Sequence, residues 1–115
     1  MTVQRFEDLK VWQKSQDLSV SIYKQFSSNK DFGFRDQITQ ASVSISNNIA
    51  EGFERKTNPD FKRFLYFSLA SNSEVRSMLY LSERLNYLEE EVASQLIDET
   101  NQVSKMFYAF IKSMK

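Results

Sequence analysis

The chain has 115 residues, of which 41% are hydrophobic, and its 15 basic and 15 acidic side chains give a formal net charge of zero. This length and apolar content predict a single domain over residues 1–115 with a core of its own. The absence of cysteine and histidine excludes disulfides and thiolate chemistry, together with the commonest general base and metal ligand.

The first helix is predicted over about residues 6–26. The chain holds only two glycines and one proline, which favours long helices joined by short turns over a sheet. Glu7 and Asp8 stand in the expected first turn, where the helix dipole favours anions. The apolar residues of this segment recur at helical spacing: Leu9, Trp12, Leu18, Ile22 and Phe26.

The second helix, predicted over about residues 34–55 with Asp31 or Gly33 near its start, is rich in small and uncharged residues. A helical wheel puts Val43 and Ala50 about 120–140° round from Ile38, where they are expected to face a second contact, and the strongly polar arc covers only about a third of the circumference. A helix with so narrow a polar side has neighbours on more than one side, which predicts a contact with another subunit. The core face itself holds Ile38, Ala41, Ser42, Ile45, Ile49, Gly52 and Phe53.

The third helix is predicted to start with Asn58 as its N-cap and Pro59 as its first helical residue, and to continue to about residue 86. The small polar stretch 70–73 is expected to lie against the small residues of the second helix. Four aromatic residues near the start cover most of the helix circumference: Phe61, Phe64, Tyr66 and Phe67. They cannot all face one core, so a protein partner, most simply another copy, is expected to cover the surplus.

The fourth helix is predicted to follow a short turn at residues 86–88 and to open with three glutamates at the positive end of its dipole. Its apolar residues follow a near-heptad pattern: Val92, Leu96, Val103, Phe107, Phe110 and Met114. Short connections make consecutive helices antiparallel. The predicted fold class is therefore all-α, an up-down-up-down four-helix bundle.

Catalysis and metal binding have little support in the sequence. The carboxylate pairs Glu51 with Glu54 and Glu83 with Glu89 lack the histidine that a di-metal bundle site requires, so their predicted role is structural. The serines of the second helix lack a histidine base and are interpreted as packing positions: Ser42, Ser44 and Ser46. We predict no catalytic residue, no metal site, no cofactor and no enzymatic activity.

The strongest functional candidate is a basic cluster at the turn between the second and third helices. Arg55, Lys56, Lys62 and Arg63 bracket this turn, where they are predicted to hold the phosphates of a nucleic acid. Lys10 and Lys14 form a second basic pair. The alternative is a solvated helix end, with Arg55 paired to Glu51 and Arg63 to Asp60 or to the phenylalanine-rich surface.

Two segments resemble the small bacterial four-helix-bundle proteins that are encoded in intervening sequences of 23S rRNA genes. They are residues 6–14 (FEDLKVWQK) and the run QI at 37–38 with ASVSISNNIAEG at 41–52. The second run carries the family motif residues Ser44, Asn47, Asn48, Glu51 and Gly52. The similarity continues at Phe61, Phe64, Leu65, Glu74, Leu81 and residues 85–88, and so covers nearly the whole chain.

The resemblance implies an antiparallel bundle that assembles as a homopentamer, without enzymatic activity. It also implies a similarity to the accessory variability determinant of diversity-generating retroelements, which binds nucleic acid and a reverse transcriptase through a basic surface. Binding of ribosomal RNA is the presumed role of the family. The chain departs from the family pattern where two arginines are usual, at Thr39 and Gln40, where a proline is usual, at Ser46, and where Gly-Ser is usual, at Ala70 and Ser71.

Two hypotheses for function follow. The first is an oligomeric bundle that binds ribosomal RNA or another nucleic acid through the basic cluster, and the second is a protein-interaction scaffold or accessory subunit without nucleic acid. The N-terminus lacks the apolar run of a signal peptide, and no apolar segment approaches the about 20 residues of a membrane span. A cytoplasmic location is therefore expected, with no membrane partner. Asn48 and Glu51 are expected to hydrogen-bond to the third helix or to a neighbouring subunit.

Overall fold

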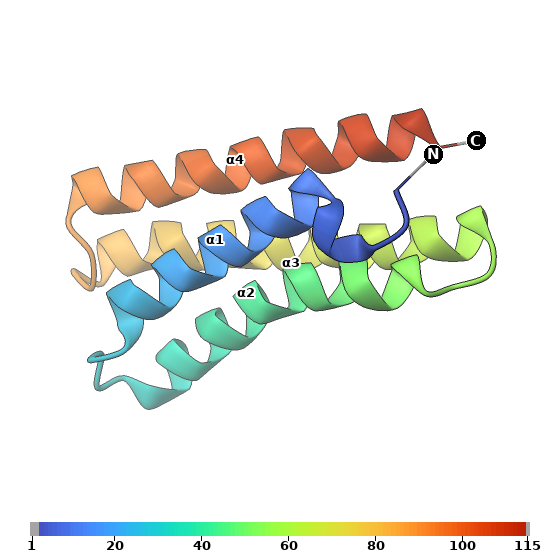
Figure 1. The fold of residues 1–115 in the computed structure, drawn as a ribbon. Coiled ribbons are helices and arrows are strands. Elements are labelled where there is room, and N and C mark those ends of the chain that lie inside the picture. The colour runs from blue at the N-terminus through green and yellow to red at the C-terminus, as the bar shows by residue number, and fades with distance from the viewer. Residues whose placement is uncertain (1–2, 115) are drawn as a thin grey trace.

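The computed structural model describes residues 3–114 as a bundle of four helices, with no strand in that part of the chain. Consecutive helices run in opposite directions, which confirms the predicted all-α up-down-up-down bundle (Figure 1). The α2–α3 turn and both ends of the described chain lie at one end of the bundle, and the other two turns lie at the opposite end (Figure 1). No helix within residues 3–114 combines the length and the apolar character needed to cross a lipid bilayer. The elements are η1 (Phe6–Asp8), α1 (Lys10–Phe26), α2 (Phe32–Phe53), α3 (Asn58–Arg84) and α4 (Glu90–Ser113).

The start of the first helix differs from the prediction. Residues 6–8 form a short 3₁₀ turn, Leu9 is extended at φ −75° and ψ 126°, and α1 begins only at Lys10. The reason is aromatic packing: the ring centroid of Phe6 lies 5.5 Å from that of Trp12 and 6.5 Å from that of Phe53 on α2. The chain must bend at Leu9 to bring Phe6 against both rings, and the bend buries Leu9.

The start of α2 follows the expected capping chemistry. Asp31 caps this helix, because its Oδ1 accepts from the amide of Phe34 at 3.2 Å; of the two residues expected near the start, Asp31 or Gly33, the aspartate is the cap. The helix itself begins at Phe32, two residues before the predicted start.

The predicted cap of α3 is wrong by one residue. Thr57 is the N-cap, with Oγ1 accepting from the amide of Asp60 at 3.3 Å, and Asn58 is the first helical residue. Thr57 holds an extended backbone, with φ −125° and ψ 151°, a conformation that suits its β-branched side chain. Beyond the other end of α3, Asn86 adopts φ 59°, a left-handed conformation that asparagine tolerates better than most residues.

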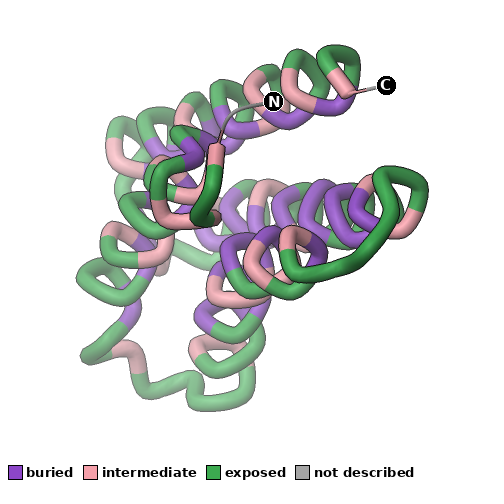
Figure 2. Tube along the Cα trace, turned by 45° about the vertical axis from the view of Figure 1, so that its right-hand side comes forward, coloured by how far each residue is buried: buried purple, intermediate pink, exposed green. Residues whose placement is uncertain are grey.

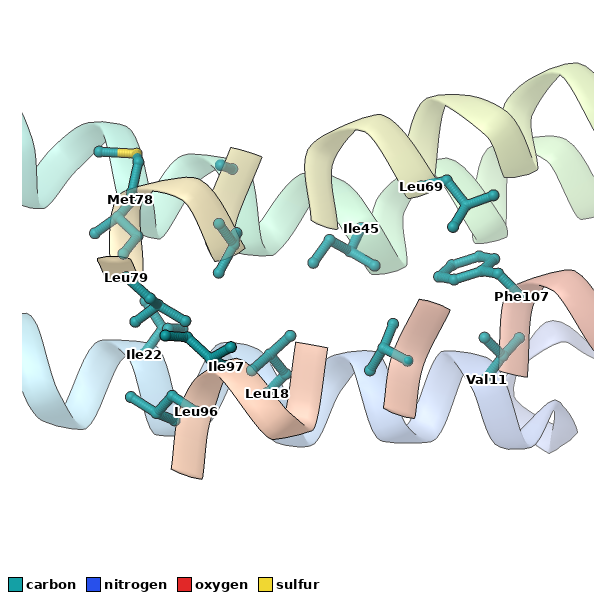
Figure 3. Close-up of a cluster of buried hydrophobic side chains, with 14 of the residues drawn as sticks. Val11, Leu18, Ile22, Ile45, Leu69, Met78, Leu79, Leu96, Ile97 and Phe107 are labelled. Carbon is teal, nitrogen blue, oxygen red and sulfur yellow. The ribbon is translucent and has the colours of Figure 1, made fainter. Parts of the chain in front are cut away.

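The core lies along the facing sides of all four helices, and Figure 2 shows buried positions recurring along each helix. Figure 3 shows how its side chains interdigitate, with Phe107 of α4 close to Leu69 of α3 and with Ile22 of α1 close to Leu79 of α3. The core face predicted for α2 is confirmed, with Phe53 only half-buried; its buried members are Ile38, Ala41, Ser42, Ile45, Ile49 and Gly52. Val43 and Ala50 are half-buried beside this face.

Small polar side chains tie α1 to α2 near mid-height. Gln16 donates from Nε2 to the hydroxyl of Ser46 at 3.1 Å, and Ser19 donates to the carbonyl of Ser42 at 2.8 Å. A hydrogen bond from a side chain to the backbone of another helix fixes their relative height, because the acceptor exists at only one level. The bond from Ser19 to the Ser42 carbonyl therefore sets the register of the first two helices.

The same level ties α3 to its two neighbours. The hydroxyl of Ser68 donates to the carbonyl of Ile45 on α2 at 2.7 Å. The amide of Asn72 donates from Nδ2 to the carbonyl of Thr100 and to the hydroxyl of Ser104 on α4, both at 2.9 Å. All three polar side chains that face inward here, on Ser68, Asn72 and Thr100, are fully buried.

Gly52 marks a close approach of α2 and α3, and the expected contact of the stretch 70–73 with the small residues of α2 stays a prediction. A Cβ atom added to Gly52 would lie 2.6 Å from the Cβ of Phe64 and 2.9 Å from Cδ1 of Phe61. In the stretch 70–73, Ala70 and Ser73 are exposed. Only a glycine at position 52 lets the two aromatic residues of α3 pack directly against the backbone of α2.

One hydrogen bond connects the two turns at the end opposite the α2–α3 turn. The hydroxyl of Tyr87, after α3, donates to Oδ2 of Asp31, the cap of α2, at 2.6 Å. This bond, with the amide of Phe34, lowers the pKa of the Asp31 carboxyl, and the bond to Asp31 raises the pKa of the Tyr87 phenol. The pair thus links the α1–α2 turn to the α3–α4 turn.

The Tyr87→Phe variant is expected to have a lower melting temperature than the wild type at neutral pH. In acid, the melting temperatures of the two proteins are expected to lie closer together. Because the pKa of Asp31 is lowered in the folded state, its contribution is present above the ordinary value of about 4 and is lost as pH falls through the folded value. Because the pKa of Tyr87 is raised, its contribution is lost as pH rises through a value above about 10. Thermal unfolding followed by circular dichroism from pH 3 to pH 7 measures the difference, and an unchanged difference across this range would contradict the role of the pair.

Candidate nucleic-acid interface

The basic cluster predicted from the sequence lies at the α2–α3 end of the bundle. Arg55 and Lys56 follow α2 in the turn, and Lys62 and Arg63 lie near the start of α3. Residues 54–63 hold four cations and two acids, a formal charge of +2 in a chain whose net charge is zero. Lys56 is exposed and Lys62 half-buried, and neither forms an ion pair within residues 3–114. Two cations are thus available to a ligand.

A single carboxylate organises the two arginines of the cluster. Asp60 accepts from Nη2 of Arg63 at 2.8 Å and from Nε at 3.0 Å, and its other oxygen lies 3.8 Å from Nε of Arg55. The predicted pair of Arg63 with Asp60 is confirmed, and the predicted pair of Arg55 with Glu51 is wrong. Helix α2 ends at Phe53, so Arg55 stands outside the helical spacing that would face it toward Glu51 and turns instead toward α3.

Aromatic rings hold the same arginines from their other side. The guanidinium carbon of Arg55 lies 4.5 Å from the ring centroid of Phe64, and that of Arg63 lies 5.0 Å from Phe64 and 5.6 Å from Phe67. The two rings meet edge to face at 5.6 Å. Cations over aromatic faces are attracted by the ring quadrupole. Arg55, Phe64, Arg63 and Phe67 thus form an ordered arginine–aromatic stack.

Two polar residues of the family motif on α2 hydrogen-bond along their own helix. Ser44 donates to the carbonyl of Gln40 at 3.0 Å, and Asn48 donates to the carbonyl of Ser44 at 2.8 Å. The expected bond from Asn48 to the third helix is therefore wrong, because its amide turns back along its own helix. Asn47 and Glu51 are exposed and make no hydrogen bond to the part of the chain that the structure describes. The alternative contact of Asn48 and Glu51 with a neighbouring subunit stays a prediction.

The hydroxyl groups considered for catalysis contact main-chain carbonyls. Ser42 donates to the carbonyl of Thr39 at 2.7 Å, and Ser46 approaches that of Val43 at 3.4 Å. Serine hydroxyls bonded to carbonyls of the preceding turn are a common packing arrangement in helices. Between residues 3 and 114 no group of three or more acidic side chains is placed to hold a metal ion.

For Arg63 the sequence predicted a pair with Asp60 or with the phenylalanine-rich surface, and both contacts are present; it did not predict that Arg55 shares Asp60 and Phe64. The spacing of Asp60, Arg63, Phe64 and Phe67 on one helix could have identified part of the stack, since residues three and four apart are neighbours. No sequence spacing predicts that Arg55 approaches from the preceding turn, because turn geometry is not periodic.

Comparison with known proteins places this geometry in a family. Residues 7–109 match the family described as 23S rRNA-intervening sequence protein. A crystal structure of a protein with unknown function from the S23 ribosomal protein family of Bacteroides thetaiotaomicron superimposes with a TM-score of 0.83 at 25% identity, covering 90% of this chain and 99% of that one. No curated protein matches the chain. Since the family match spans most of the sequence and the fold agrees, the chain belongs to the 23S rRNA-intervening sequence protein family.

Proposed function

We propose that this chain is a non-enzymatic, homo-oligomeric bundle that binds ribosomal RNA or another nucleic acid through the α2–α3 end. The observation that supports RNA binding is the basic cluster, in which Lys56 and Lys62 carry charges that no acid within residues 3–114 neutralises. Phosphate contacts from lysine and arginine supply most of the sequence-independent affinity for nucleic acid. The family's association with the 23S rRNA intervening sequence makes ribosomal RNA the first ligand to test.

The double variant Lys56→Glu/Lys62→Glu is expected to weaken binding to 23S rRNA fragments by about tenfold or more at low salt. It is also expected to reduce the slope of log affinity against log salt by about two, because two phosphate contacts are lost. The lysines are chosen because replacing either arginine would also disturb the stack with Phe64. Gel shifts over a salt series measure both quantities.

Lys30→Glu/Lys105→Glu is the matched control for this experiment. These two exposed lysines lie in the α1–α2 turn and on α4, outside the basic cluster, so the same change in net charge should leave affinity within about twofold. Absence of binding by the wild type at low salt would refute the RNA proposal. Equal losses in both double variants would refute its location.

The oligomer rests on exposed apolar side chains away from the basic cluster. One such surface lies toward and just beyond the end of α3, where the exposed side chains are Tyr80, Leu81 and Leu85. A second lies on α1, where the exposed Val20 and Tyr23 line a shallow groove together with Val43 of α2. A contact between two different surfaces of identical chains forms a ring when the rotation that relates the copies closes, and an open filament otherwise. We propose that these surfaces meet between copies, in the pentamer that the family resemblance implies.

Light scattering is expected to give a mass of about 68 kDa, five chains of 13.5 kDa each. Leu81→Glu/Leu85→Glu should lower this mass toward that of one chain without loss of helical circular dichroism, because both side chains are exposed in the isolated bundle. Tyr108→Glu, an exposed position on α4, should leave the mass unchanged. A monomeric wild type at micromolar concentration would rule out the assembly.

A protein-interaction scaffold without RNA is the second candidate. Glu54 and Asp60 halve the formal charge of the cluster, and the same exposed apolar surfaces suit a different protein. This alternative predicts a co-purifying protein partner and a preparation free of nucleic acid. Purification from the native cell, followed by mass spectrometry and ultraviolet absorbance, separates the two candidates.

A further inference from the structure

Two exposed aromatic rings lie on α3 beside the basic cluster. Tyr66 is 53% exposed and Phe67 is 44% exposed, although both belong to a helix whose inner face is well packed. Their neighbours Phe61 and Phe64 are buried, with Phe64 only 7% exposed, and contact the backbone of α2 at Gly52. The fold therefore uses two of the four aromatic residues in this segment and leaves the other two facing outward.

Phe67 continues the arginine–aromatic stack, and Tyr66 is exposed next to it in sequence. Arg63 lies over both Phe64 and Phe67, and its Nε and Nη2 are held by Asp60, so its guanidinium plane is ordered before any ligand arrives. Arg55 lies over Phe64 as well, and the two arginine side chains are about half exposed. Flat cationic and aromatic surfaces thus alternate over the first turns of α3.

Nucleobases stack on both kinds of surface. Base–aromatic stacking and arginine stacking dominate the recognition of single strands, while lysines hold the backbone. In a duplex the base faces are covered by neighbouring base pairs, so only phosphates and groove edges are accessible. A surface of exposed rings next to unpaired lysines therefore distinguishes unpaired from paired nucleotides.

We infer that the ligand of this site is single-stranded RNA, with unpaired bases stacking on Tyr66, Phe67 and Arg63 and with phosphates at Lys56 and Lys62. The inference rests on the proposed RNA binding and specifies the part of an RNA that is bound.

The charges favour an RNA strand over a second copy of the chain at this surface. Two guanidinium groups share the single carboxylate of Asp60, so one positive charge remains without a partner acid. An apolar subunit face would remove water from that charge without compensating it, which is costly, whereas an RNA strand brings phosphates. The apolar surface at Tyr80, Leu81 and Leu85 includes no such arginine stack.

The test compares one labelled RNA strand of about 12 nucleotides, alone and annealed to its complement, by fluorescence anisotropy. The wild type is expected to bind the single strand at least about fivefold more tightly than the duplex, the gain from stacking one base. Tyr66→Leu/Phe67→Leu keeps apolar bulk but removes both rings, and should abolish this preference while duplex affinity stays the same. Tyr108→Leu, which removes an equally exposed ring from α4, should keep the preference.

Each outcome separates the inference from the proposal beneath it. Equal binding of single strand and duplex, or an unchanged preference in Tyr66→Leu/Phe67→Leu, overturns the inference and leaves RNA binding intact. Absence of binding to both RNA forms at low salt overturns RNA binding itself. Loss of oligomer mass in Tyr66→Leu/Phe67→Leu by light scattering assigns the rings to a contact between copies and also overturns the inference.

Discussion

Gly52→Ala is expected to destabilise the bundle by about 2 kcal/mol or more, the cost of adding a methyl group to a closely packed core. The added Cβ would lie 2.6 Å from the Cβ of Phe64, an atom that cannot move without its backbone, and 3.3 Å from the carbonyl oxygen of Phe61. Relief of that overlap requires α2 and α3 to separate over the most extensive helix pair in the bundle. Alanine also favours helix by about 1 kcal/mol over glycine, which offsets part of the loss.

Gly33→Ala is the matched control for this substitution. Gly33 also lies on α2, but its added Cβ would meet only Oδ1 of Asp31 at 4.0 Å, an ordinary contact. The control is therefore expected to be neutral or to stabilise the chain by up to about 1 kcal/mol. Urea denaturation at one chain concentration measures both variants. Equal stabilities for Gly52→Ala and the wild type would show that the two helices are not held together by this close contact.

Helical periodicity predicted the parts of this fold that depend on one helix at a time. The core face of α2 from Ile38 to Gly52 and the cap at Asp31 follow from spacing and capping chemistry, both local properties of the sequence. The start of α1 was predicted four residues early. Its bend serves the contact of Phe6 with Phe53, which is distant in sequence and invisible to any local pattern.

The candidate site likewise contains one contact that is local in sequence, and so predictable, and one that is not. Arg63 and Asp60 are three residues apart on one helix, and their ion pair was predictable from that spacing. Arg55 reaches the same carboxylate across a turn, whose path depends on Thr57 rather than Asn58 capping α3. Both residues are good caps by type, so only the extended backbone at Thr57 decides between them. The helical wheel predicts that some of the four aromatic residues near the start of α3 are exposed. It does not identify Tyr66 and Phe67 as the exposed pair, because it does not show which aromatic residues contact Gly52.

Asn72→Asp is expected to destabilise the bundle by about 3 kcal/mol or more at neutral pH, because it places an uncompensated charge in the core. Asn72 is 0% exposed, and its Nδ2 donates to the carbonyl of Thr100 and to Ser104, whereas its Oδ1 has no hydrogen-bond partner. A carboxylate of the same shape would turn an oxygen toward the Thr100 carbonyl, which cannot donate. The half-buried Arg76 donates from Nη1 to Oδ1 of Asn101 at 3.2 Å and to the Ser104 hydroxyl at 3.4 Å, so its guanidinium already has partners on α4.

The loss in Asn72→Asp should depend on pH in a direction that identifies its cause. Burial without a donor raises the pKa of the introduced carboxyl above its ordinary value of about 4. Below about pH 4 the introduced carboxyl is protonated in both the folded and the unfolded state and can donate to Thr100, so the loss of stability relative to wild type is smallest there. The loss grows as pH rises, until the carboxyl also ionises in the folded state. Asn47→Asp, the same change at an exposed position on α2 without a hydrogen bond within residues 3–114, should alter stability by less than about 0.5 kcal/mol at every pH. Urea midpoints at pH 4 and pH 7 test this, and a loss in Asn72→Asp that does not change with pH would mean that shape, not charge, is what the core rejects.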